Sequence, residues 1–146
     1  MVKRPNIGTS EDWTIIYDDI DYLQSAVLIG HRKATELLLH RLNVPGLNIQ
    51  FPRCVLRILG SAATLLERYE QAKEHYKEAI KVCADMRFRP ELALSRLQFA
   101  ELLLDHYPNE KSEALEHLDF AIKECREMKM QSALERALRR KDILKA

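Results

Sequence analysis

Five histidines and three cysteines are among the residues of this chain that could bind a metal ion or act as a base or nucleophile. Helical metal sites place their ligands three or four residues apart, so that the ligands share one face. The chain contains no His-x-x-x-His or Glu-x-x-His pair of this kind. We therefore expect no metal site and no catalytic histidine. His75 and His117 instead hold equivalent positions in two similar segments, which is typical of boundary residues inherited by duplication.

The cysteines favour packing over chemistry. Cys83 and Cys125 fall on apolar stripes, where a thiol behaves as a small hydrophobic group, whereas Cys54 is expected to be more exposed at the start of a helix. Nucleophilic catalysis needs a base and an oxyanion donor beside the thiol, and the sequence offers neither. We expect no catalytic residue and no cofactor. The odd cysteine count, without a Cys-x-x-Cys pair or a signal peptide, predicts a cytoplasmic protein.

Charged residues form two conspicuous groups, and neither predicts a binding site. Asp18, Asp19 and Asp21 are expected on the solvated face of an amphipathic helix. Arg136 and residues 139–141 form a basic cluster near the C-terminus, without the interleaved aromatic residues that stack on nucleobases. With a net charge of +1, we do not expect nucleic-acid binding. The apolar runs are far shorter than the ~20 residues needed to span a bilayer, so no membrane contact is expected.

The composition predicts long helices in one domain. The 146 residues are 47% hydrophobic and include only 4 Gly and 5 Pro. Residues 1–9 are expected to form a flexible tail, with Thr9 or Ser10 capping the first helix, and residues 10–146 a single domain. No segment shows the sustained alternation typical of a strand. The predicted fold is all-α, with helices from residue 10 to Gly30 and at about 31–42, 53–66, 68–86, 90–107, 111–128 and 131–144.

An internal repeat organises these helices. When residue 71 is aligned with residue 113, the segments 71–86 and 113–128 match at 8 of 16 positions. A match at a fixed spacing indicates stacked supersecondary units, each of which buries its apolar face against the next. The positions expected to face inward alternate small and large side chains: Ala72, Tyr76, Ala79, Ile80 and Cys83, and their equivalents Ala114, Leu118, Ala121, Ile122 and Cys125.

Residues 59–79 resemble a tetratricopeptide (TPR) repeat. The Leu-Gly pair of the first TPR helix corresponds to residues 59–60, and the small, aromatic and small positions of the second helix to Ala72, Tyr76 and Ala79. The chain departs from the pattern where Leu56 replaces Trp, Ala63 replaces Tyr, and Phe99-Ala100 replaces the second Leu-Gly pair. The resemblance implies about three antiparallel helix pairs followed by a C-terminal capping helix.

A longer resemblance begins near Gly30 and extends to the C-terminus. The chain is similar to the TPR-like C-terminal arms of bacterial signalling ATPases and of LuxR-type or adenylate-cyclase-linked regulators. The shared motifs, in order, are Leu59 to Ala63, Ala72 to Ala79, Met86-Arg-Phe-Arg-Pro90 and Leu92-Ala93. The phosphate-binding loop of such ATPases is absent from this sequence.

The resemblance implies a concave groove lined by the first helix of each pair. Its register assigns six groove positions as candidate partner-binding residues: Tyr17, Gln24, Arg57, Ser61, Thr64 and Glu101. The leading hypothesis is a non-catalytic module that binds a protein or peptide partner in a bacterial regulatory system. Three alternatives stay open: a regulatory arm of a signalling ATPase or transcriptional regulator, a small-ligand-binding or enzymatic helical domain, and pairing of an apolar terminal face with a second copy as a homodimer.

Overall fold

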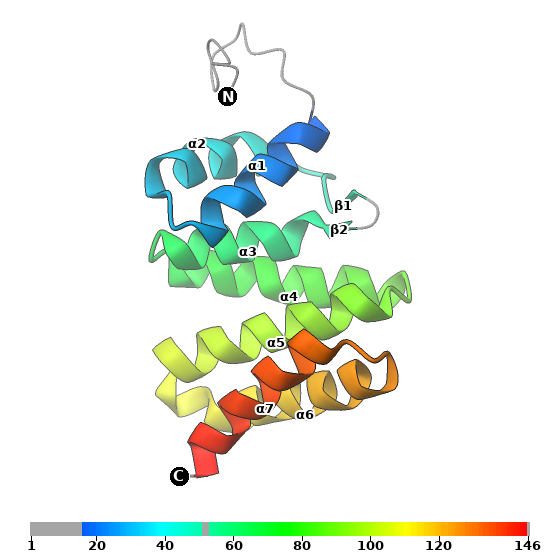
Figure 1. The fold of residues 1–146 in the computed structure, drawn as a ribbon. Coiled ribbons are helices and arrows are strands. Elements are labelled where there is room, and N and C mark those ends of the chain that lie inside the picture. Colours follow the sequence, from blue (N-terminus) through cyan, green and yellow to red (C-terminus); the bar gives the residue numbers. More distant parts are fainter. Residues whose placement is uncertain (1–15, 51–52, 146) are drawn as a thin grey trace, which may run out of the picture.

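The computed structural model describes residues 16–50 and 53–145, and within them the chain is all-α, as the sequence predicts. The predicted tail (residues 1–9) and the predicted cap at Thr9 or Ser10 lie outside the described residues. Figure 1 shows the elements stacked in chain order. They are α1 (Ile16–Leu28), α2 (Arg32–Leu42), β1 (Ile49–Gln50), β2 (Arg53–Cys54), α3 (Val55–Leu65), α4 (Tyr69–Asp85), α5 (Arg89–His106), the 3₁₀ helix η1 (Pro108–Glu110), α6 (Lys111–Glu127) and α7 (Gln131–Lys145).

The helices form a layered stack in which each α-helix packs against the next. The odd-numbered helices also contact one another in succession: α1 meets α3, α3 meets α5, and α5 meets α7. These four helices therefore form a continuous row along the stack. The central member is α5, which packs against α3, α4, α6 and α7 and carries the fully buried side chains of Leu97, Phe99 and Leu103.

The repeat recurs in the local geometry of the chain. Arg87 follows α4 with φ 54°, and Lys129 follows α6 with φ 56°. In both turns the next amide donates to a carbonyl five residues back: Phe88 to Cys83 at 2.8 Å and Met130 to Cys125 at 2.9 Å. This left-handed residue with its 6→1 hydrogen bond is the Schellman motif. The two copies therefore enter α5 and α7 through the same turn.

The predicted inward faces of α4 and α6 are buried. On α4, Ala72, Tyr76, Ala79 and Cys83 are buried and Ile80 is half-buried; on α6, all five predicted positions are buried. Close approach of α3 to α4 depends on Gly60, because a Cβ there would lie 2.7 Å from Cε1 of Tyr76. No side chain fits at that distance without movement of the ring.

The predicted start of the third helix is wrong. Arg53 and Cys54 pair with Gln50 and Ile49 as two-residue antiparallel strands, so α3 begins at Val55. The prediction that Cys54 is more exposed is also wrong, since the side chain is 0% exposed. The reason is tertiary: its amide donates to the Glu91 carboxylate of α5 at 2.9 Å, and its thiol lies 3.8 Å from the carbonyl oxygen of Asn48.

The prediction that the acidic residues of α1 are all solvated is wrong for Asp19. Asp19 is buried, and its carboxylate lies 2.6 Å from Nε of Arg41 on α2. The helical periodicity of α1 alone does not show that α2 brings a guanidinium against this position. Asp21 remains exposed and forms an ion pair with Arg53.

Large exposed apolar side chains gather on the N-terminal part of the stack. Leu28 and Ile29 at the end of α1 are 79% and 76% exposed. Pairing with a second copy through a terminal face stays a prediction. The other exposed large apolar side chains of α1, α2 and the segment after α2 are Tyr22, Leu37 and Val44.

Candidate functional site

A buried ion pair joins α3 to α5 on the face formed by the odd-numbered helices. Arg57 donates from Nε to Oε2 of Glu91 at 2.8 Å and from Nη2 to Oε1 at 3.1 Å. The two side chains are only 9% and 7% exposed. Oε2 also accepts the amide of Cys54 at 2.9 Å. This paired geometry is strong and directional, so it locks the start of α5 against α3.

The polar contacts continue from this pair toward α4. Oε1 of Gln98 accepts from Nη1 of Arg57 at 3.4 Å and from the Ser61 hydroxyl at 3.1 Å. The Ser61 hydroxyl also lies 3.2 Å from the hydroxyl of Tyr76. Burial raises the pKa of Tyr76, although hydrogen bonds from Ser61 and Thr64 oppose that rise. Tyr76 is therefore a neutral phenol at physiological pH and ends the network as a hydrogen-bonding group.

Two ion pairs tie α7 to α5. Arg136 donates from Nε to Oε1 of Glu101 at 2.7 Å, and one turn later Arg140 pairs with Asp105. Lys141 pairs with Asp119 on α6. The predicted basic cluster at the C-terminal end is therefore largely neutralised by carboxylates of neighbouring helices.

The structure joins the predicted groove residues Arg57 and Ser61 in one polar network through Gln98. Thr64 donates to the carbonyl of Gly60 within α3, and Glu101 pairs with Arg136 of α7. Of the remaining two, Gln24 is half-buried on α1 and makes no side-chain hydrogen bond within the described part of the chain, and the side chain of Tyr17 lies outside it.

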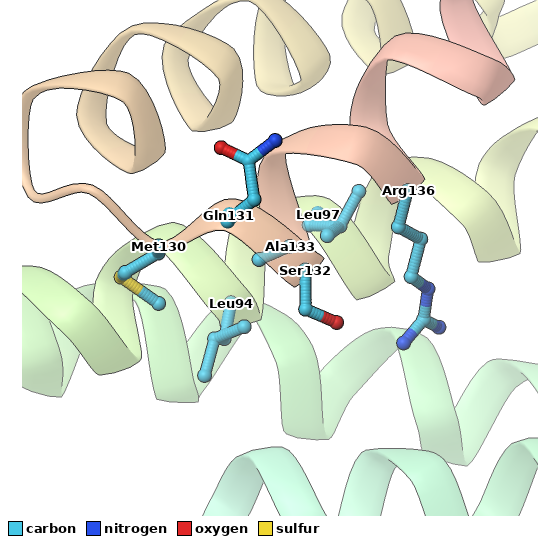
Figure 2. A pocket seen from close by; sticks show the side chains of 7 residues that line it. All are labelled: Leu94, Leu97, Met130, Gln131, Ser132, Ala133 and Arg136. Atoms are coloured by element: carbon cyan, nitrogen blue, oxygen red, sulfur yellow. The ribbon is translucent and has the colours of Figure 1, made fainter.

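A hollow of about 340 Å³ lies between α5 and the first turns of α7. Figure 2 shows Leu94 and Met130 at one end of it and Arg136 at the other. Most of its lining residues are apolar, so it presents an apolar floor with a polar rim. None of the six predicted groove residues lines it. The lining residues are Leu94, Leu97, Met130, Gln131, Ser132, Ala133 and Arg136.

The repeat explains why the hollow lies here. The burial pattern of α3 recurs on α5 in a register that places Leu97 at the position equivalent to Arg57. The shared turn aligns the start of α5 with the start of α7, which places Ala133 at the position equivalent to Glu91. An ion pair of two large side chains thus fills the space between α3 and α5, whereas a leucine and an alanine hold the equivalent positions between α5 and α7. This register, present in the sequence, is the signal that could have located the hollow.

His75 and His117 occupy equivalent positions on α4 and α6, away from the hollow. Burial lowers the pKa of both. The charge of Arg96 lowers the pKa of His117 further, while Glu113 opposes that shift. Both imidazoles are therefore neutral at pH 7. His117 also packs against Phe99, with ring centroids 5.0 Å apart.

Comparison of the chain with protein families, with curated proteins and with solved structures finds no match. In residues 16–50 and 53–145, no three side chains of His, Cys, Asp or Glu are grouped as metal ligands. Across the same ranges, no helix has both the length and the apolar character needed to cross a membrane.

Proposed function

We propose that the chain is a non-catalytic, TPR-like interaction module that docks a peptide or protein partner on the face formed by α3, α5 and α7. The observation that carries this proposal is the hollow between α5 and α7. Pockets with an apolar floor and a few polar groups at the rim suit one large side chain of a partner together with its backbone. The partner's anchor is therefore an apolar side chain lying over Leu94, Leu97 and Ala133.

The rim can orient the backbone of such a partner. Arg136 uses Nε and Nη2 for Glu101, which leaves the Nη1 donors for an acceptor on the ligand. Ser132 is exposed beside the apolar floor. Arg57 contributes to this face indirectly, because its guanidinium is engaged by Glu91 and Gln98 and holds α3 against α5.

Two features support the TPR-like part of the proposal. The odd-numbered helices contact one another in succession, and the Schellman turn that follows α4 recurs after α6. The motif order shared with bacterial regulator arms supports a role for this cytoplasmic module in a regulatory or signalling system.

Selection from a random peptide library on the immobilised chain tests the proposal. We expect enriched peptides to share one large apolar residue, and Ser132→Trp to abolish their binding because the indole fills the hollow. Ser112→Trp is the matched control, since Ser112 is equally exposed but lies on α6 and does not line the hollow. Selection without enrichment, or peptides that bind both variants equally well, would refute the proposed site.

A further inference from the structure

The last helix, α7, is the least deeply buried α-helix in the part of the chain that the structure describes. Its 15 residues include one buried side chain, Ala137. The neighbouring helix α6 has 17 residues and buries six of them, and α5 buries eight of its 18. Since burial of apolar surface contributes most to the attachment of a helix, α7 is held less firmly by packing than its neighbours are. The other apolar residues of α7 that pack against the core are half-buried: Ala133, Leu134, Leu138 and Leu144.

Three ion pairs also attach α7 to the stack, and in each of them α7 supplies the cation. They are Arg136–Glu101 and Arg140–Asp105 on α5, and Lys141–Asp119 on α6. One side chain of every pair is about half exposed: 49% for Arg136, 52% for Asp105 and 58% for Asp119. Ion pairs exposed to this extent contribute little stability, and dissolved salt weakens them. The charged attachment of α7 is therefore sensitive to ionic strength.

The hollow undercuts the first turns of α7 (Figure 2). Its floor includes Leu94 and Leu97 of α5, and every other lining residue belongs to α7 or to the turn before it. The equivalent space between α3 and α5 is filled by the Arg57–Glu91 ion pair. Packing is thus less complete at the start of α7 than at the start of α5. If α7 moved away, only the two leucines would remain of the site.

We propose that α7 is a releasable lid, which detaches from α5 and α6 as one unit while the preceding helices stay folded. Residues 128–130 form its hinge, because α6 ends at Glu127 and α7 begins at Gln131. Segments with few buried apolar contacts open locally at a lower free energy than the whole fold requires. Release dismantles the hollow and so regulates docking there, and this consequence rests on the proposed function.

The N-terminal end of the stack provides an internal comparison. There α2 has only 11 residues but buries four of them, and α1 packs against both α2 and α3. This pair is therefore better anchored than α7, although it also ends the described stack. We expect the stack to open first at its C-terminal end. The buried residues of α2 are Thr35, Leu38, Leu39 and Leu42.

Hydrogen–deuterium exchange of the full-length chain, measured by mass spectrometry without any peptide, tests the lid. The amides of α7 should exchange faster than those of α2, α5 and α6. Raising sodium chloride from about 0.01 M to about 1 M should accelerate α7 selectively, because the Debye length falls from about 30 Å to about 3 Å.

Two variants change the ion pairs without altering the sequence of α7. Asp105→Asn and Asp119→Asn should each accelerate exchange of α7 about 1.5- to 5-fold, and should leave α3 and α4 unchanged. Glu36→Gln is the matched control. It breaks a similarly exposed ion pair with Arg68, which joins α2 to the residue before α4, and it should leave α7 unchanged.

Exchange of α7 at the rate of α6 in every protein would overturn the proposal, because the helix would then open only with its neighbour. Variants that leave α7 unchanged, or that accelerate α3 and α7 alike, would overturn it too. A failed peptide selection would refute only the docking site, since this exchange is measured without a ligand. A selected peptide should slow the exchange of α7, and an unchanged rate would refute the regulation of docking.

Discussion

Two successive helix interfaces of the stack are filled in opposite ways at equivalent positions. Between α3 and α5, the Arg57–Glu91 ion pair fills the interface and carries a polar network. Between α5 and α7, the equivalent positions hold Leu97 and Ala133, and a hollow opens to solvent. The backbone repeat thus sets where a space lies, and the side chains decide whether it is closed by an ion pair or left for a ligand.

The helix pairs show a parallel contrast. In the α3–α4 pair, Gly60 lies against the ring of Tyr76, whose hydroxyl reaches the polar network. In the α5–α6 pair, the equivalent positions are Ala100 and Leu118, both buried and apolar. A phenol needs a glycine opposite it, whereas a leucine tolerates an alanine. The hydroxyl that extends the polar network onto the second helix of a pair is therefore found on α4 and not on α6.

The largest effect is expected from breaking the ion pair. Glu91→Ala leaves Arg57 buried without its counter-charge, which should lower the free energy of unfolding by about 3–5 kcal/mol. The double variant Arg57→Leu/Glu91→Ala reproduces the leucine and alanine found between α5 and α7. It should recover most of that loss, because no buried charge remains. Urea unfolding measures both. A single variant that loses less than about 1 kcal/mol would show that the pair is solvated and that the two layers differ less than the contacts indicate.

Gly60→Ala should cost about 1–3 kcal/mol, because the new methyl group forces the Tyr76 ring out of its position. The same substitution in a Tyr76→Leu background reproduces the small–large pair of α5 and α6. There it should be neutral or stabilising by up to about 1 kcal/mol, since alanine favours helix over glycine. Thermal unfolding of the four proteins in this cycle checks the sign change. If Gly60→Ala lowers the stability equally in both backgrounds, the Tyr76 ring is not what excludes a methyl group at residue 60.

Acidification should destabilise the protein through His75 and His117. Their pKa values are lowered from the ordinary 6.5, so below about pH 6.5 the unfolded chain binds protons that the folded chain does not. Stability is therefore complete above this pH and falls as the pH is lowered toward the folded-state values. His117→Gln and His75→Gln should each reduce the pH dependence of the melting temperature, because burial lowers the pKa of both imidazoles. Identical slopes in both variants and wild type would contradict these assignments.

The smallest effects should be found at the two equivalent turns. Arg87→Gly and Lys129→Gly should each stabilise the fold by about 0.5–1 kcal/mol, because glycine adopts positive φ without strain. Their equality is the test of the repeat, since the two turns share their hydrogen bonds. Lys81→Gly is the control: it lies exposed within α4 and should cost about 1 kcal/mol. Effects of opposite sign at the two turns would show that the copies differ locally.

Much of the fold could be predicted from periodicity, but the six predicted groove residues do not line the hollow. The seven helices and the inward faces of α4 and α6 follow the spacing of apolar residues, because a helix buries one stripe wherever it packs. The groove assignment of Arg57, Ser61 and Glu101 rests on helical register and stays a prediction. The contacts that each of these side chains makes could not be predicted. Asp19 and Cys54 were misplaced for the same reason, since their partners Arg41 and Glu91 lie on other elements.

The helices, the repeat that relates α4 to α6 and the buried stripes can all be read from the sequence, because they depend on local spacing and on a register that the chain carries along its length. The pairing of Arg57 with Glu91, the bond from the Cys54 amide to Glu91 and the hollow over Leu97 and Ala133 are visible only in the folded chain. Those contacts join residues far apart in the chain. They depend on how far each helix slides and rotates against its neighbour, and close packing of all the side chains together sets that geometry.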